Sequence, residues 1–284
     1  MRKFTFLFLL IFMVACDDTR SLENIASPTP SKTASQEEVK SDNKTIVGEF
    51  SEKKAFEFLY GNYNEEQKEA NWRPTKEELA KISSSANASS QIFENNEFYI
   101  TPVLVAPFLE AGTEKNLLIT AALPPEYDCH ACAPMISAAL FKKNANNWEL
   151  EFEQKYLFEL GSYGTAPDAK LVKIGNDKYG VLFETGDTGQ GYTYEGLSLV
   201  TKLDKGFQKI LEVETGGDNS GTCGDELGPC WKFSSKYEFI SGKNPNFFDF
   251  KIMTSGTKGE ENNIVPVNEN KLYQFDGKEY KAIP

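Results

Sequence analysis

The residue types best suited to chemistry lie in one short segment, Cys129-His130-Ala131-Cys132. It fits three interpretations: a structural disulfide within a turn, a redox-active pair, or a metal site of thiolates and imidazole to which Asp128 adds an oxygen donor. A redox-active pair acts from a helix N-terminus, but Pro124 and Pro125 precede this segment and a strand-like run follows it. The disulfide is therefore favoured. A closed zinc site draws its ligands from two separated segments, which leaves Cys129, His130 and Cys132 as weak metal candidates.

A second local pair of cysteines, Cys223 and Cys230, encloses a loop containing glycines and a proline. Apart from Cys16 the chain has four cysteines, and an even number in an exported chain predicts disulfides. We expect the bonds Cys129–Cys132 and Cys223–Cys230. Closing the second loop stabilises the fold by about 2–3 kcal/mol in the chain-entropy model.

His130 is the only histidine, which limits the enzyme classes available. Any Ser-His-Asp or Cys-His mechanism would depend on this residue, which lies between two expected half-cystines. Attached haem requires Cys-x-x-Cys-His, and Ala133 occupies the position of that histidine. We assign no catalytic residue and expect no cofactor. A hydrolase that uses paired carboxylates remains the enzymatic alternative, because no sequence spacing reveals such pairs.

The segment from Glu184 to Glu195 is rich in glycine, acidic residues and aromatics. Tyr192 and Tyr194 are two residues apart, so they would project from one face of a strand. Together with Asp187 and Gln190 they form a candidate site for a sugar or a peptide. The alternative is a long hairpin loop with core tyrosines. A phosphate-binding loop is excluded, since the Walker lysine and the following Ser/Thr are missing.

The part of the chain that must position these groups, residues 96–284, has the pattern of an antiparallel β domain. Trp148, Leu150 and Phe152 alternate with glutamates, which predicts a strand with the three apolar side chains on one face. Hairpin turns are expected at 175–177, 204–206 and 276–277. The predicted fold is mainly β, an antiparallel β-sandwich or open barrel, with a propeller-like arrangement as the alternative.

A short helical segment, residues 49–95, precedes the β domain. Ser51 can cap a helix that carries Phe56 on one side, and Thr75 and Glu78 have the spacing of a capping box. The sequence therefore predicts two helices here.

The propeller alternative comes from the C-terminal part of the chain. The run from Asn246 to Ile252, followed by Gly256, and the closing run from Tyr273 to Tyr280 resemble a blade of VCBS/FG-GAP β-propellers. The resemblance covers about 45 residues. Asn244 and Asn246 stand where that family would place aspartates.

The first residues have the marks of a secretory signal. Arg2 and Lys3 precede an almost unbroken apolar run of 11 residues, Phe4 to Val14, which is too short to span a bilayer as a helix. The segment Met13-Val14-Ala15-Cys16 resembles the bacterial lipobox, with Met13 where leucine is usual. The resemblance implies that residues 1–15 are a signal peptide and that Cys16 carries acyl chains. Asp17 resembles an inner-membrane retention signal, with the outer membrane as the alternative location.

Residues 16–48 are polar, with few apolar side chains, so we expect a lipid-anchored disordered linker. The formal net charge of −12 becomes −14 when the two positive charges of Arg2 and Lys3 leave with the signal peptide. Clustered basic residues are absent, which excludes nucleic acid as a partner.

The sequence thus predicts a lipid-anchored cell-envelope protein facing the periplasm. It would be held by acyl chains on Cys16 and would act as a non-enzymatic binding or structural module, with an envelope protein or glycan as its partner. The alternatives are the carboxylate hydrolase acting on envelope polymers and a redox or metal-handling lipoprotein centred on the segment 129–132.

Overall fold

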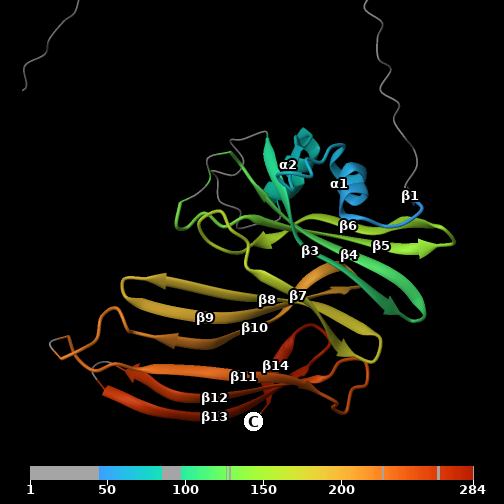
Figure 1. Ribbon diagram of the computed structural model, residues 1–284. Coiled ribbons are helices and arrows are strands. Elements are labelled where there is room, and N and C mark those ends of the chain that lie inside the picture. Colours follow the sequence, from blue (N-terminus) through green and yellow to red (C-terminus); the bar gives the residue numbers. More distant parts are fainter. Residues whose placement is uncertain are drawn as a thin grey trace, which may run out of the picture. The chain divides into compact units, whose positions relative to one another are not determined.

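The computed structural model describes residues 45–84, 97–125, 127, 129–225, 227–260 and 263–283 (Figure 1). The expected signal peptide, Cys16 and the linker up to residue 44 lie outside the described residues, as do residues 85–96, which include the end of the helical segment. Among the described helices, none has the length and apolar character needed to cross a membrane.

The first sheet has six antiparallel strands in the order β1-β6-β5-β4-β3-β2. Its strands are β1 (Thr45–Val47), β2 (Ala70–Trp72), β3 (Phe98–Glu110), β4 (Thr113–Leu123), β5 (Met135–Asn144) and β6 (Asn147–Glu159). The last residues of the expected linker therefore form β1, which pairs with the start of β6.

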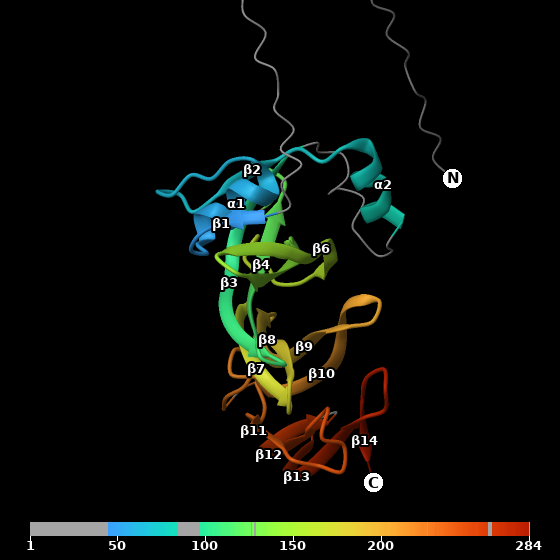
Figure 2. The same ribbon diagram turned by 90° about the vertical axis from the view of Figure 1, so that its right-hand side faces the viewer.

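The second sheet has eight antiparallel strands in the order β14-β13-β12-β11-β10-β9-β8-β7. Its strands are β7 (Asp168–Gly175), β8 (Lys178–Gly189), β9 (Tyr192–Leu203), β10 (Gly206–Asp218), β11 (Lys232–Ile240), β12 (Asp249–Glu260), β13 (Asn263–Phe275) and β14 (Tyr280–Ile283). β10 and β11 pair only through Gly216–Asp218 and Lys232–Ser234. The sheet curls at this junction, so that β11–β14 pack against β7–β10 (Figures 1 and 2).

Three apolar cores hold these layers together. The first packs the helices on the first sheet, the second lies between the first sheet and β7–β10, and the third lies between the two halves of the second sheet. Figure 1 shows the resulting order of helices, β3–β6, β7–β10 and β11–β14. The predicted antiparallel sandwich or open barrel is confirmed, and the described strands belong to two continuous sheets rather than to separate four-stranded blades.

The two predicted helices are α1 (Glu52–Tyr60) and α2 (Lys76–Ser84). The Ser51 side chain accepts a hydrogen bond from the Lys54 amide at 3.3 Å. At α2 the predicted capping box is formed: Thr75 N donates to the Glu78 carboxylate at 2.8 Å, and Glu78 N donates to the Thr75 hydroxyl at 3.2 Å. The α1 side chain Phe56 is completely buried in the first core.

All three predicted hairpins are present. β7 and β8 close with Gly175 opposite Lys178, β9 and β10 with Leu203 opposite Gly206, and β13 and β14 with Phe275 opposite Tyr280. Local turn chemistry was therefore sufficient to predict the neighbouring strand pairs.

The prediction that Phe152 lies on the same face of the sheet as Trp148 and Leu150 was wrong. The register of β5 with β6 shifts between Leu140, opposite Phe152, and Phe141, opposite Leu150. This bulge puts one extra residue into β6 and reverses the alternation beyond it. Leu150 packs on the first core, whereas Phe152 packs on the second core at the opposite face of the sheet.

Candidate functional site

The segment 129–132 forms a tight turn in the connection from β4 to β5. Cys129 and Cys132 are disulfide-bonded with their Cα atoms 4.9 Å apart, and Cys132 N donates to Cys129 O at 2.9 Å. Cys132 is buried and Cys129 is exposed. The favoured interpretation, a disulfide within a turn, agrees with this geometry.

His130 projects from this turn towards the second sheet. Its Nε2 atom lies 2.9 Å from Oδ1 of Asp187 on β8, and its ring packs on Tyr163 with centroids 4.7 Å apart. Tyr163 lies in the β6–β7 connection, where it has a left-handed φ of 50°. The same connection anchors the turn through a 2.8 Å hydrogen bond from Gly164 N to Cys132 O. The disulfide turn therefore fixes His130 between two other segments.

An open cleft of about 790 Å³ lies beside the His130–Asp187 pair. Its walls come from the disulfide turn, the β6–β7 connection, and strands β8, β9 and β10. Six carboxylate residues are among those that line it: Asp168, Glu184, Asp187, Glu195, Glu212 and Glu214. No lysine or arginine is among the lining residues, so the cleft is acidic.

Lysines outside the lining neutralise three of these carboxylates. Lys170 pairs with Glu184, and its hydrogen bond holds the pKa of that carboxyl below the usual range. Lys209 lies 2.6 Å from Glu212, and Lys258 lies 2.7 Å from Glu214. Asp187 pairs with His130, so four of the six lining carboxylates form ion pairs. Asp168 and Glu195 form none with the described residues. The cleft keeps a net negative charge.

The predicted ligand-binding residues are distributed over the β8–β9 hairpin. Asp187 lies directly opposite Tyr194 in the strand register, and both line the cleft. Tyr192 and Tyr194 share a face as predicted, with ring centroids 6.5 Å apart and an interplanar angle of 16°. Gln190 lies at the turn of the hairpin with a left-handed φ of 52°, outside the lining of the cleft. Three of the four candidates therefore lie together, and Gln190 forms the turn.

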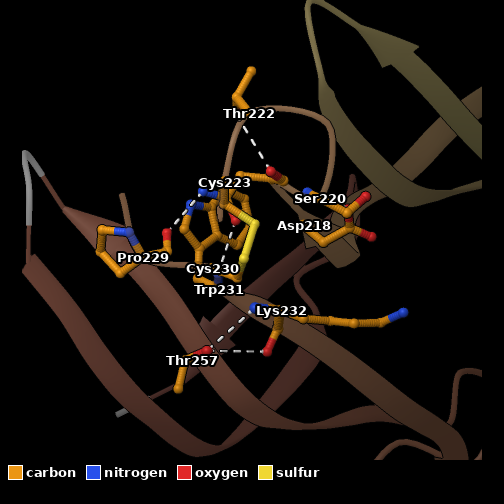
Figure 3. Close-up of a disulfide and its surroundings, with 10 residues drawn as sticks. Asp218, Ser220, Thr222, Cys223, Pro229, Cys230, Trp231, Lys232 and Thr257 are labelled. Atoms are coloured by element: carbon orange, nitrogen blue, oxygen red, sulfur yellow. Dashed lines mark hydrogen bonds between the residues drawn. A yellow bond between two sulfur atoms is a disulfide. The ribbon is translucent and has the colours of Figure 1, made fainter. Parts of the chain in front are cut away.

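The second disulfide lies beside this hairpin. Cys223 and Cys230 are bonded, with Cα atoms 5.0 Å apart, and the loop they close leads directly into Trp231 (Figure 3). Buried Asn219 fixes the base of the loop: its amide donates to Pro229 O at 3.1 Å, and its side-chain oxygen accepts from Trp231 N at 2.8 Å. The loop therefore holds Trp231, the residue directly before β11.

Four aromatic side chains form a continuous row across the second sheet, hereafter the aromatic row: Tyr194, Tyr192, Trp231 and Phe233. The rings of Tyr192 and Trp231 are 6.3 Å apart, and those of Trp231 and Phe233 are 6.1 Å apart. The first two members are 51% and 37% exposed, whereas Phe233 is buried. The row leads from the cleft towards the disulfide loop.

Sequence reasoning did not find Trp231 or Tyr163. Trp231 directly follows Cys230 and alternates with Phe233, which is the one local signal that could have indicated it. Tyr163 has no such signal, because its place beside His130 depends on a contact between two loops.

The other interpretations of the segment 129–132 gain no support from the geometry. The turn follows a strand and precedes a strand, so the described residues offer no helix N-terminus to lower a thiol pKa. Asp128 lies outside the described residues, and within those described no three His, Cys, Asp or Glu side chains converge as a metal site.

Comparison of the chain with protein-family models, with curated proteins and with solved structures finds no match. The class of this protein therefore follows from its own fold and site: an all-β, two-disulfide protein with an acidic cleft and an adjoining aromatic row.

Proposed function

We propose that the chain is a lipid-anchored cell-envelope protein whose β body binds another envelope component in the acidic cleft. The observation that carries the binding role is the cleft itself, where His130 of the disulfide turn meets Asp187 of the β8–β9 hairpin beside Tyr194. Ligand sites are concave and carry convergent polar groups that orient the ligand; this cleft is concave and presents His130 and Asp187 together.

The anchoring rests on the first 17 residues. The signal-like start and the lipobox-like segment at Cys16 support acylation, and each buried CH₂ of an acyl chain contributes about 0.8 kcal/mol to membrane binding. The full chain carries a formal net charge of −12, or −14 once Arg2 and Lys3 leave with the signal peptide, so anionic lipid repels it and the acyl chains supply the attachment. Asp17 favours retention at the inner membrane, with the β body facing the periplasm.

Palmitate labelling tests the anchor. Cys16→Ser should abolish labelling and slow or prevent signal cleavage, whereas the double variant Cys129→Ser/Cys132→Ser should keep both. Label that persists in Cys16→Ser refutes the anchor.

Site-specific photo-crosslinking in intact cells tests the binding role. A photoreactive residue replacing Tyr194, which lines the cleft, should give a discrete adduct. The matched control is the same replacement at Tyr99 on β3, a tyrosine that is 38% exposed and lies outside the cleft. Equal adducts from both positions, or none from either, would contradict binding in the cleft.

A hydrolase acting on envelope polymers is the second candidate, and the carboxylates that line the cleft favour it. Purified protein incubated with envelope polymer distinguishes the two functions. Release of soluble fragments that is lost in Asp187→Asn would establish hydrolysis. Polymer binding without release supports the binding module.

A redox role is tested by thiol titration of the purified protein. Both cysteine pairs should be unreactive before reduction and reactive after reduction under denaturing conditions. Free thiols at Cys129 and Cys132 in protein isolated from cells would favour the redox alternative instead.

A further inference from the structure

We propose that the ligand of the cleft is a glycan with free amino groups, whose sugar rings pack on Tyr194, Tyr192 and Trp231. This inference rests on the proposed binding function and adds the chemical class of the ligand. It depends on three features: the spacing of the aromatic row, the rigidity of its support, and the charge of the cleft beside it.

The spacing of the aromatic row suits a chain of rings. Successive centroids are 6.5 and 6.3 Å apart from Tyr194 through Tyr192 to Trp231, and the first two rings are nearly parallel. Aromatic faces carry partial negative charge, so they attract the polarised C–H groups on the flat side of a sugar ring and also attract ammonium groups. Three rings in a row can hold more than one sugar unit.

The support of the row is built into the sheet. A Cβ atom on Gly259 would lie 2.4 Å from the Trp231 ring, and one on Gly217 would lie 3.1 Å from the Phe233 ring. A side chain at Gly259 would therefore displace the Trp231 ring, and one at Gly217 would press on the Phe233 ring. The Cys223–Cys230 bond and Asn219 fix the loop that precedes Trp231. Trp231 is therefore held in place before a ligand arrives, which reduces the entropy cost of binding at this ring.

The charge of the cleft selects among glycans. Asp187 lies opposite Tyr194 in the strand register, and five further carboxylate residues line the cleft without a lysine or arginine among them. Carboxylates accept hydrogen bonds from sugar hydroxyls and form charge-assisted bonds with ammonium groups. Uronate or phosphate groups would be repelled. A sugar polymer with free amines is thus complementary to both the rings and the acids.

Isothermal titration of the full-length protein in detergent tests this inference with three matched oligosaccharides. A glucosamine hexamer should bind most tightly, its N-acetylated counterpart should bind at least about tenfold more weakly, and a galacturonate hexamer should not bind. Affinity for the glucosamine hexamer should fall as salt concentration rises. Equal binding of the first two sugars, or preference for galacturonate, overturns the inference.

Variants connect the binding to the aromatic row. Tyr194→Ala and Trp231→Ala should each weaken binding of the glucosamine hexamer by at least about tenfold, which corresponds to 1.4 kcal/mol. Tyr99→Ala should leave it unchanged, because this tyrosine is exposed on the first sheet. Asp187→Asn should reduce the ratio of the affinities for the glucosamine hexamer and its N-acetylated counterpart. Full binding by Tyr194→Ala or Trp231→Ala would contradict the inference.

The failure of this inference can be distinguished from the failure of the proposed function. A protein adduct from Tyr194 in cells, with no binding of any of the three sugars, would leave a binding protein with a polypeptide ligand and overturn the glycan assignment. Absence of both sugar binding and adducts would overturn both proposals.

Discussion

The side chains of His130 and Asp187, 57 residues apart in the chain, meet with Nε2 2.9 Å from Oδ1. The pair joins the disulfide turn that follows β4 to strand β8 of the other sheet. Its members are 46% and 58% exposed, so their interaction contributes little to stability. Its consequence is geometric, because it ties the disulfide turn to β8, and both of these segments line the cleft.

The first prediction concerns this pair. Asp187→Ala should change the free energy of unfolding by less than about 1 kcal/mol. It should nevertheless speed amide hydrogen exchange at Cys132 and Gly164. The Cys132 N–H donates to Cys129 O inside the turn, and the Gly164 N–H donates to Cys132 O. Asp187→Asn keeps a side-chain oxygen and should show a smaller effect. Unaltered exchange at both amides in Asp187→Ala would show that the pair does not hold the turn.

The second prediction concerns the disulfide beside Trp231. Removing the Cys223–Cys230 bond by a double Cys→Ala substitution should lower the free energy of unfolding by about 2–3 kcal/mol, as measured by urea denaturation. The matched control removes the Cys129–Cys132 bond, whose sequence separation is 3 rather than 7. Its loss should be smaller, about 2 kcal/mol, since a shorter loop restricts the unfolded chain less. The reverse order would contradict the chain-entropy explanation.

The hairpins and the antiparallel fold class could be predicted from the sequence because their signals are local. Asp276 and Gly277, which lie between two apolar runs, are a strong local signal for a hairpin turn. The face of Phe152 could not be predicted, because the bulge in β6 depends on its pairing with β5 and leaves no mark in the alternation of residues.

The sequence pattern also did not show that β4 is buried on both faces. Every residue from Asn116 to Ala122 on β4 is buried, since the helices cover one face of the first sheet and β7–β10 cover the other. A continuous apolar run does not by itself reveal which elements cover it. The candidate site was likewise predicted only in its local parts. The chemistry of residues 129–132 and of the β8–β9 hairpin was visible in the sequence, but their meeting through His130 and Asp187 required the fold.

The third prediction concerns Asn219, which is 7% exposed and hydrogen-bonded at both ends of its amide. Asn219→Ala should cost about 1–3 kcal/mol of unfolding free energy, because Trp231 N and Pro229 O lose their partner. Trp231 fluorescence should shift to longer wavelength as the ring becomes more hydrated. Asn219→Asp keeps the acceptor for Trp231 N but sets a carboxylate oxygen against Pro229 O, so it should also destabilise. An unfolding free energy of Asn219→Ala equal to that of the wild type would contradict this role of Asn219.

The last prediction compares two glutamates that share one lysine. Glu78 lies 2.8 Å and Glu153 3.9 Å from the Lys155 ammonium. Burial raises the pKa of the Glu153 carboxyl above 4.5, and Lys155 only partly opposes the rise. Burial also disfavours the charge of Glu78, but hydrogen bonds from Lys155 and Thr75 outweigh burial and lower its pKa below 4.5. The two groups therefore contribute to stability with opposite dependence on pH.

A raised native-state pKa means that the contribution of Glu153 is complete below pH 4.5 and is lost as the pH rises through the native-state value. Glu153→Gln should therefore raise the melting temperature at pH 7 and have little effect at pH 4. The contribution of Glu78 is present above pH 4.5 and is lost as the pH falls through its lowered value. Glu78→Gln should therefore destabilise at pH 7, by no more than about 1 kcal/mol for a partly exposed pair. Thermal melts of both variants at the two pH values provide the measurement. Destabilisation of equal size by both substitutions at pH 7 would show that Lys155, rather than burial, governs the ionisation of Glu153.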